Sequence, residues 1–282
     1  MRNFVRFYID DMRCTIFTFC IFVGLLSMIF CSCGENEELT AEELLLRAKA
    51  VEKTDPQQAL LTLDSIHECF PRNVKMRRAA DTVMWRIELA QAMKSLPYVD
   101  SVISEKEKML AEMSVKFVYS KDDLYQDLGV WEHRVFRTES NTGRNYLKPT
   151  VKENGEITMT SFYAGREEKH DGIAVTVGEY TKQVTDIDGG TSFVDLGVYH
   201  EFLSVTETTD DGLTKFIAEM QGENAMVNLL STGEVKVKYK ISNRDMAAIR
   251  ETYALAITVG DLWNLQRDRV KFQKQIERYC HK

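Results

Sequence analysis

Residues 105–120 read EKEKMLAEMSVKFVYS, and the spacing of apolar side chains changes within this stretch. Its first part combines alternating charges with apolar residues at helical spacing, whereas the final FVYS is typical of a strand. The charged run has the composition of a solvated helix face. The change near Val115 therefore predicts an α+β protein, with a helical domain at residues 40–114 and a β-rich domain at residues 115–242.

The helical domain contains four segments in which apolar residues recur every three or four positions. Start and stop signals set their expected limits. A capping box at residues 40–43 starts the first helix, and Asp55 before Pro56 starts the second. Asn73 caps the third helix, Pro97 ends it, and the fourth helix is expected at residues 100–113. The pattern predicts N-terminal helical hairpins.

The second of these helices carries part of a known repeat pattern. Ala59, Leu63 and Pro71 lie where the second half of a tetratricopeptide repeat has Ala, a large apolar residue and Pro, and Leu46 fits its first half. The hairpin therefore resembles one tetratricopeptide-type unit. The other first-half positions depart from the pattern, and no second copy follows at the same period. The resemblance implies helix packing and a docking surface.

The β-rich domain alternates short apolar segments with turn signals. The expected strands begin at residue 116 and continue at residues 130–137, 157–163, 173–184, 193–206, 226–230 and 235–241. Turns are expected at residues 153–155, 188–190 and 231–233, each of which contains glycine. A short helix at residues 213–220 interrupts the strands. Short connections of this kind predict a mostly antiparallel β-sandwich module.

Residues 243–282 form the longest helical pattern of the chain. Its first half has a rich apolar stripe, Gly260 is a weak point within it, and its last turns are strongly basic. A helix of this length exceeds what the β module needs for cover. We therefore expect this C-terminal helix to pack on the N-terminal helices.

The stretch CTIFTFCIFVGLLSMIFCSC at residues 14–33 has no charge and is long enough to cross a bilayer. It ends in Phe30, Cys31, Ser32 and Cys33, followed by glutamate-rich residues. A small residue before a cysteine at the end of an apolar run is typical of a processed leader, whereas an uncleaved anchor remains the alternative. Met12 gives a more basic start than Met1, so both start sites remain open.

This ending resembles the lipobox of bacterial lipoproteins, with Cys33 as the lipidated residue after Ser32. Cys31, which follows bulky Phe30, is the weaker alternative. The resemblance implies a signal peptide at residues 1–32, fatty acyl chains such as palmitate on Cys33, and an acidic tether at residues 33–39. It also implies a location in the cell envelope at the outer membrane. The acidic cluster resembles the surface-export signal of Bacteroidota lipoproteins, which implies exposure outside the cell.

The composition is that of a globular protein, with 282 residues, 44% hydrophobic content and a net charge of −7. An acidic chain without a basic block does not match nucleic acid, whose phosphates require clustered Lys and Arg. Only Cys69 and Cys280 lie outside the stretch at residues 14–33, so no disulfide framework is implied. Whether these two cysteines pair is left open.

The sequence shows no catalytic or metal-binding constellation. The histidines are not at ligand spacing from one another, and each is expected to be solvated or at the edge of the core: His67, His133, His170, His200 and His281. His133 and His200 adjoin glutamates, but neighbouring strand residues point to opposite faces. The DIDGG run at residues 186–190 is similar to the start of a calcium loop, yet Gly197 occupies the required acidic position, so a turn is expected. No cofactor, metal or catalytic residue is predicted.

Aromatic residues gather in the β-rich domain. They are Trp131, Tyr146, Phe162, Tyr163, Tyr180, Phe193, Tyr199 and Phe202. A sheet core uses the same residue types, whereas an exposed subset would stack on sugar rings. The sequence favours an envelope lipoprotein that acts as a non-catalytic interaction or ligand-binding accessory protein, with membrane lipid and a protein or glycan as partners. Two alternatives stay open: a glycan hydrolase with dispersed carboxylates, and a structural subunit that self-associates through its terminal helix.

Overall fold

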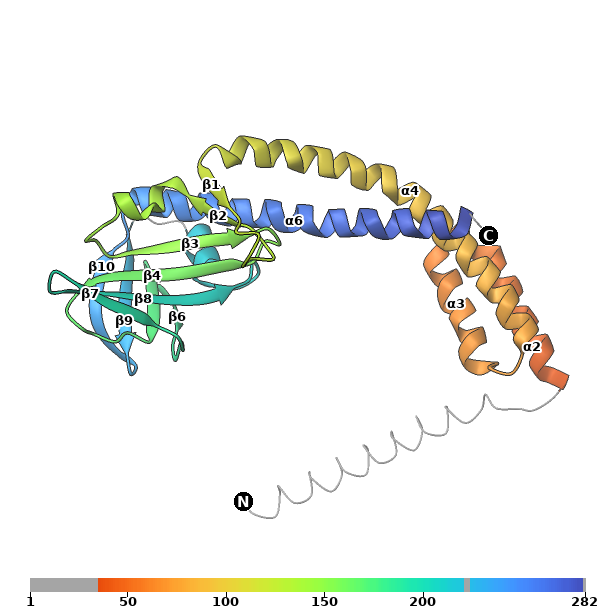
Figure 1. Ribbon diagram of the computed structural model, residues 1–282. Coiled ribbons are helices and arrows are strands. Elements are labelled where there is room, and N and C mark those ends of the chain that lie inside the picture. The colour runs from red at the N-terminus through yellow and green to blue at the C-terminus, as the bar shows by residue number, and fades with distance from the viewer. Residues whose placement is uncertain (1–34, 221–223, 281–282) are drawn as a thin grey trace, which may run out of the picture. The chain divides into compact units, whose positions relative to one another are not determined.

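The computed structural model describes residues 35–220 and 224–280, so the leader and Cys33 lie outside the described residues (Figure 1). The described chain divides into two compact units. One contains residues 35–93 and 275–280 and is helical, and the other, Lys94–Lys274, contains both sheets. The predicted α+β class is confirmed. No helix of the described segments is both long enough and apolar enough to span a membrane.

The helical unit is built from α2 (Glu35–Val51), α3 (Pro56–Cys69) and the first half of α4 (Val74–Ser114). Small residues let these helices approach closely, because Ala41, Ala48, Ala59 and Ala80 are fully buried. Larger side chains fill the space between them, including Leu63. The helical hairpin predicted from the sequence is therefore confirmed.

Two predicted caps are present. The Asp55 carboxylate accepts a hydrogen bond from the amide of Gln58 at 3.0 Å, and the Asn73 side chain accepts one from the amide of Met76 at 3.2 Å. The capping box at residues 40–43 is wrong, because α2 begins at Glu35 and Thr40 lies inside it. The helix thus occupies most of the expected tether.

The prediction that Pro97 ends a helix is also wrong. α4 continues through Pro97 as one helix of 41 residues. Proline has no amide hydrogen, so the carbonyl of Met93 receives no helical hydrogen bond from position 97. Met93 and Tyr98 are exposed, which leaves this turn open to water, while Ala92 and Val99 are buried on its other side. Because Ala92 and Val99 are buried before and after Pro97 in the chain, packing stabilises α4 as one continuous helix.

The C-terminal helix α6 (Asn243–Cys280) packs on α4 as predicted. In the larger unit, Val99 and Ile103 of α4 share a cluster with Leu262 of α6, and Lys106 donates to Asp261 at 2.7 Å. In the helical unit, the rings of Trp85 and Tyr279 stack with centroids 6.1 Å apart. Cys69 is a free, exposed thiol. The side chain of Cys280 lies outside the described residues.

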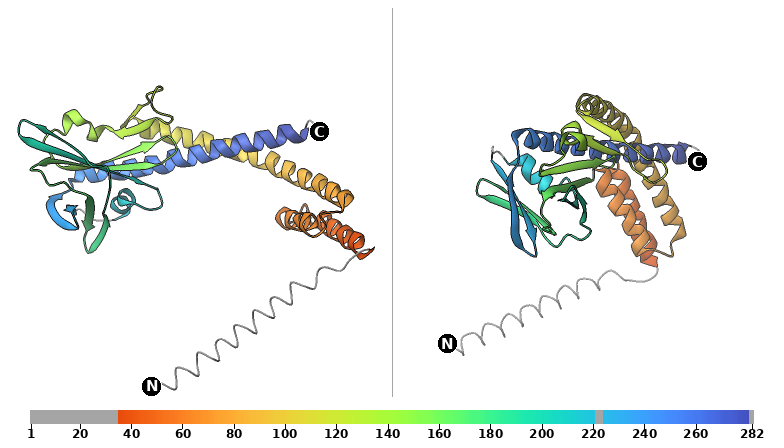
Figure 2. Two further views of the ribbon diagram at one scale, coloured as in Figure 1. Left: turned by 60° about the horizontal axis from the view of Figure 1, so that its bottom comes forward. Right: turned by 60° about the vertical axis from the view of Figure 1, so that its left-hand side comes forward.

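Two antiparallel sheets form the larger unit (Figures 1 and 2). The six-stranded sheet has the order β1 (Phe117–Ser120), β2 (Val130–His133), β3 (Tyr146–Lys152), β4 (Ile157–Gly165), β8 (Val198–Glu207) and β7 (Thr191–Asp195). The four-stranded sheet has the order β10 (Glu234–Lys240), β9 (Ala225–Ser231), β5 (Gly172–Val177) and β6 (Tyr180–Val184). Side chains of both sheets, of α5 (Leu213–Glu219) and of the start of α6 share one apolar cluster. The core therefore lies between the sheets.

The strand predictions were mostly confirmed, with four differences. The segment predicted at 130–137 is a strand only as far as His133, and a 3-10 helix follows at Arg134–Phe136. Strand β3 was not predicted, and it contains Pro149, a residue that is rare inside strands. Its pairing with β2 covers Lys152, Val151 and Thr150 and does not reach Pro149, which has no amide hydrogen to donate. The segments at 173–184 and 193–206 are each a hairpin of two strands. Their tight turns contain Gly178 and Gly197 at positive φ. The short helix at 213–220 was predicted correctly.

Gly260 has a packing role that its position in the helix did not indicate. The turn between β3 and β4 contains Gly155 at φ +87°. A Cβ atom on Gly155 would lie 2.7 Å from the Cα of Gly260, and one on Gly260 would lie 3.6 Å from the Cα of Gly155. Two glycines in contact thus let the hairpin rest directly on α6.

Candidate functional site

Four aromatic side chains form a row on the outer face of the six-stranded sheet, which we call the aromatic row: Tyr146, Phe162, Phe202 and Phe193. On β4, Met159 and Ser161 are buried against the other sheet, so Phe162 between Ser161 and Tyr163 points outward. Strand register aligns the row, because Tyr146 pairs with Phe162, which pairs in turn with Phe202. The ring centroids are 4.5 Å and 5.0 Å apart.

The row is covered at one end and open at the other. Tyr146 is only 3% exposed, because Phe136 stacks on it and the Arg144 guanidinium lies over its ring at 4.8 Å. Phe193, on edge strand β7, is 52% exposed and stacks on His200 at 4.8 Å and on Phe202 at 5.6 Å. A ligand can therefore reach the row from the β7 side.

A hollow of about 210 Å³ lies over the row, and we call it the aromatic hollow. Its second wall is the segment that contains the short 3-10 helices at Arg134–Phe136 and Thr138–Ser140. The hollow is lined by Thr138, Asn141, Thr142, Gly143, Arg144, Tyr146, Phe162, Tyr163, Ala164, Phe193, Asp195, His200 and Phe202.

The one guanidinium in this lining is held by neighbouring side chains. Arg144 donates to both carboxylate oxygens of the buried Asp245, at 2.5 and 3.0 Å, and to Asn141 at 2.7 Å. Burial raises the pKa of Tyr146 to about 12, so its phenol stays neutral at physiological pH. The hollow consequently offers aromatic faces and the polar groups of Thr138, Thr142, His200 and Asp195, without an unpaired positive charge in this lining.

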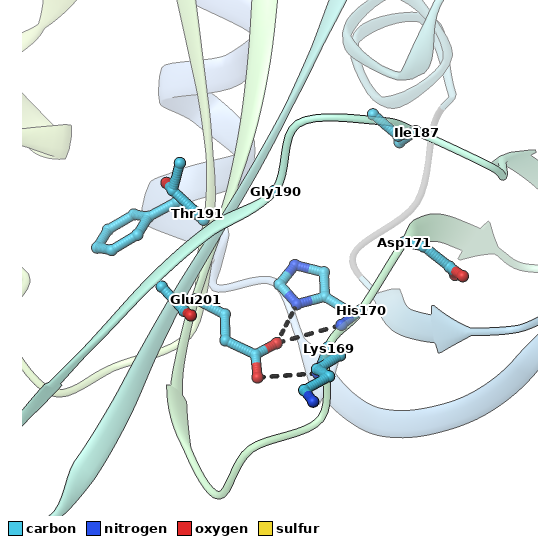
Figure 3. Close-up of a pocket in the computed structure, with 9 residues that line it drawn as sticks. Lys169, His170, Asp171, Ile187, Gly190, Thr191 and Glu201 are labelled. Atoms are coloured by element: carbon cyan, nitrogen blue, oxygen red, sulfur yellow. Dashed lines mark hydrogen bonds and ion pairs between the residues drawn. The ribbon is translucent and has the colours of Figure 1, made fainter.

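A second hollow, of about 240 Å³, lies beside a buried chain of hydrogen bonds that we call the buried relay (Figure 3). The Glu201 carboxylate lies 2.7 Å from Nδ1 of His170, and Nε2 of His170 lies 3.2 Å from Oγ of Ser161. Glu201 also accepts hydrogen bonds from the backbone amides of Glu168, Lys169 and His170, at 2.6 to 3.2 Å. Figure 3 shows the carboxylate between the His170 ring and the backbone of Lys169.

These partners fix the charge of the relay. Burial by itself would raise the pKa of Glu201, but the hydrogen bonds from His170 and the three amides outweigh it, so this pKa lies below its usual value. An ionised carboxylate only accepts, so Nδ1 of His170 donates to Glu201, while Nε2 of the same ring shares the hydrogen bond with the Ser161 hydroxyl.

The buried relay has the carboxylate–imidazole–hydroxyl order of a serine hydrolase, but its serine is not accessible to a substrate. Ser161 is fully buried in the core and does not line the hollow, so a substrate carbonyl has no route to its Oγ. Asp171, the other carboxylate of this hollow, points away from Glu201 and accepts from the amide of Thr232 (Figure 3). Since Ser161 and Glu201 belong to one sheet and His170 precedes β5 of the other, the relay joins the two sheets.

A second histidine pairs with a distant glutamate. His133 accepts a hydrogen bond from the Val135 amide at Nδ1, and its Nε2 lies 2.9 Å from Glu251, which also binds Lys116 at 2.6 Å. Burial lowers the pKa of His133 and outweighs the opposing effect of Glu251. As predicted, neither His133 nor His200 meets its sequence neighbour. The expectation of solvated or core-edge histidines is wrong for His133 and His170, which are buried.

The remaining predicted features lie apart from the aromatic row. The rings of Trp131 and Tyr119 lie in tilted contact on the β1–β2 pair, and Tyr180 is exposed on β6. The DIDGG run is irregular backbone between β6 and β7 rather than the predicted turn, with Asp186 and Gly189 at positive φ. Within residues 35–220 and 224–280, no group of three or more His, Cys, Asp or Glu side chains is placed to hold a metal. In the lining of the aromatic hollow, Asp195 is the single carboxylate, so the pair that a glycan hydrolase needs is not formed there.

Comparisons with protein-family models, with curated proteins and with solved structures found no match.

Proposed function

We propose that this protein is a non-catalytic envelope lipoprotein, anchored through acylated Cys33, that binds a glycan in the aromatic hollow. The observation that carries the proposal is the aromatic row, which runs along one sheet face and ends in the half-exposed Phe193. The apolar C–H face of a sugar ring packs on an aromatic face, much as aromatic rings pack on one another. The hydroxyl, imidazole and carboxylate groups at the rim match sugar hydroxyls.

Charge and size narrow the ligand class. The guanidinium of Arg144 is neutralised by Asp245, so the hollow favours an uncharged sugar over a phosphate or another anion. Pockets that enclose a drug-sized ligand measure about 300–1,000 Å³. A hollow of about 210 Å³ is smaller, and it fits one sugar ring with the rest of the glycan outside.

Replacement of Phe193 by Ala tests the proposal. We expect the affinity for a glycan identified on a glycan array to fall about 2- to 12-fold, the equivalent of ~0.5–1.5 kcal/mol of stacking. Isothermal titration calorimetry of the full chain in detergent measures this change. Tyr180→Ala is the matched control, because Tyr180 is an exposed aromatic on an edge strand of the other sheet. Equal affinities for Phe193→Ala and the wild type, or no glycan bound on the array, would overturn the proposal.

A further inference from the structure

Strand β7 is an unprotected edge of the six-stranded sheet. Among the described strands it pairs with β8 alone, and all five of its residues are exposed. Its sequence, TSFVD, contains neither lysine nor proline. Natural sheets protect exposed edges with such residues, with bulges or with very short strands, because a free edge recruits another strand.

The other edges carry this protection. Strand β10 has Lys236, Lys238 and Lys240 and a register shift between Val235 and Val237. Strand β6 carries Lys182, and β1 is only four residues long. The end of β7 is instead followed by a turn at which Leu196 is 98% exposed. Among the outer strands of the two sheets, β7 therefore stands out as the fully exposed edge without lysine, proline or a register shift.

We propose that β7 pairs antiparallel with β7 of a second copy of this chain, centred on Phe193. In this register Phe193 lies opposite the partner's Phe193, Ser192 opposite the partner's Val194, and Thr191 opposite the partner's Asp195. Asp195 is the single charged residue of β7, and here it faces a hydroxyl. A register centred on Asp195 would instead place two carboxylates opposite each other, which is destabilising. The strand is therefore self-complementary in the register centred on Phe193.

Pairing of this kind would extend the aromatic row. A two-fold axis perpendicular to the sheet keeps the outer faces of both copies on the same side. The two Phe193 rings would then join two aromatic rows into one strip across both subunits. This consequence rests on the proposed glycan function: each copy would bind one ring, and the pair would bind a polymer more tightly by linking two sites.

The interface is small. Stable interfaces bury about 1,200–2,000 Å² in total, and a pair of five-residue strands buries less. We therefore expect a weak dimer that forms where the local concentration is high, as it is for chains held on one membrane.

Cysteine crosslinking of the full chain in the membranes of the expressing cells tests the proposal. Opposed residues of antiparallel strands have Cα atoms about 4.5–5.5 Å apart, within the range of about 4.4–6.8 Å for disulfides. Under mild oxidation, Phe193→Cys should give a disulfide-linked dimer on a non-reducing gel, above the background of the wild type with its native cysteines. Tyr180→Cys, on exposed edge strand β6, is the matched control. Equal crosslinking of the two variants would overturn the proposal.

A charge exchange at Thr191 tests the register. In the Phe193→Cys background, Thr191→Asp places a carboxylate opposite the partner's Asp195 and should reduce crosslinking several-fold. Thr191→Lys at the same exposed site should preserve or increase it. The same response to both changes would overturn the register. No glycan is added in either experiment and neither readout measures glycan binding, so a failure of the glycan proposal leaves these outcomes unaffected.

Discussion

At the scale of single residues, function and stability depend on alternation along strands. On β8, His200 and Phe202 face the aromatic hollow, while Glu201 between them faces the core and the buried relay. The alternation predicted from the sequence correctly separated these neighbours. It could not identify the partners of the buried histidines, because His170 and Glu201 are 31 positions apart and His133 and Glu251 are 118 positions apart. Such pairs are brought together only by the topology.

The contact between Gly155 and Gly260 leads to a prediction about stability. Alanine at position 155 would adopt a left-handed conformation, at about 1–2 kcal/mol, and would also press its Cβ against the α6 backbone. With about 1–3 kcal/mol for the steric overlap, we expect Gly155→Ala to lower the free energy of unfolding by roughly 2–5 kcal/mol in urea titrations.

Gly233→Ala is the control for this prediction. Gly233 has φ +80°, and an added Cβ would meet no atom within 4 Å. Its replacement should therefore cost only the conformational part, about 1–2 kcal/mol. If the two variants lose the same stability, the close contact between the hairpin and α6 does not contribute.

At the scale of elements, the sequence predicted the helices and most strands, and both main errors involve proline. Strand β3 was not predicted because its sequence contains Pro149, which argues against a strand. In the structure Pro149 has no pairing partner in β2, so its missing amide hydrogen costs no bond to that strand. Pro97 suggested two helices, whereas burial on either side of it preserves one. In both cases tertiary packing outweighed a local propensity that the sequence displays clearly. The aromatic row was likewise visible only as a group of residues, because its alignment depends on register across β3, β4 and β8.

Replacement of Pro97 by Ala should stabilise α4. Alanine restores the amide that the Met93 carbonyl lacks, and proline in a helix interior costs about 3 kcal/mol relative to alanine. Greater freedom of the unfolded chain offsets about 0.4–1 kcal/mol of this gain. We therefore expect a net gain of about 2–2.6 kcal/mol in thermal or urea unfolding, with slower hydrogen exchange around residue 97. Lys94→Ala, on the same turn, should change stability by less than about 0.5 kcal/mol. A loss of stability in Pro97→Ala would contradict this account.

At the scale of the whole molecule, the proposed tether determines where the aromatic hollow operates. If Cys33 carries the acyl chains, Cys33→Ala should abolish fatty-acid labelling and release the chain from the membrane fraction. A single acyl chain binds a membrane only marginally, so anchoring depends on the full set of chains attached at this residue. Metabolic labelling with an alkyne fatty acid, followed by fractionation, measures both effects. Cys31→Ala is the control and should retain both. Survival of labelling and membrane retention in Cys33→Ala would show that another residue is lipidated.

The alternation on β8 also limits how this protein can change in length. A residue inserted into β8 would invert every position beyond it, so that Phe202 would enter the core and Glu201 would turn to solvent. Replacement of one side chain removes only the contacts of that residue. An insertion of one residue instead moves every following side chain of the strand to the opposite face of the sheet. Natural or engineered insertions should therefore be accepted in the loop at residues 121–129 and rejected between Tyr199 and Leu203.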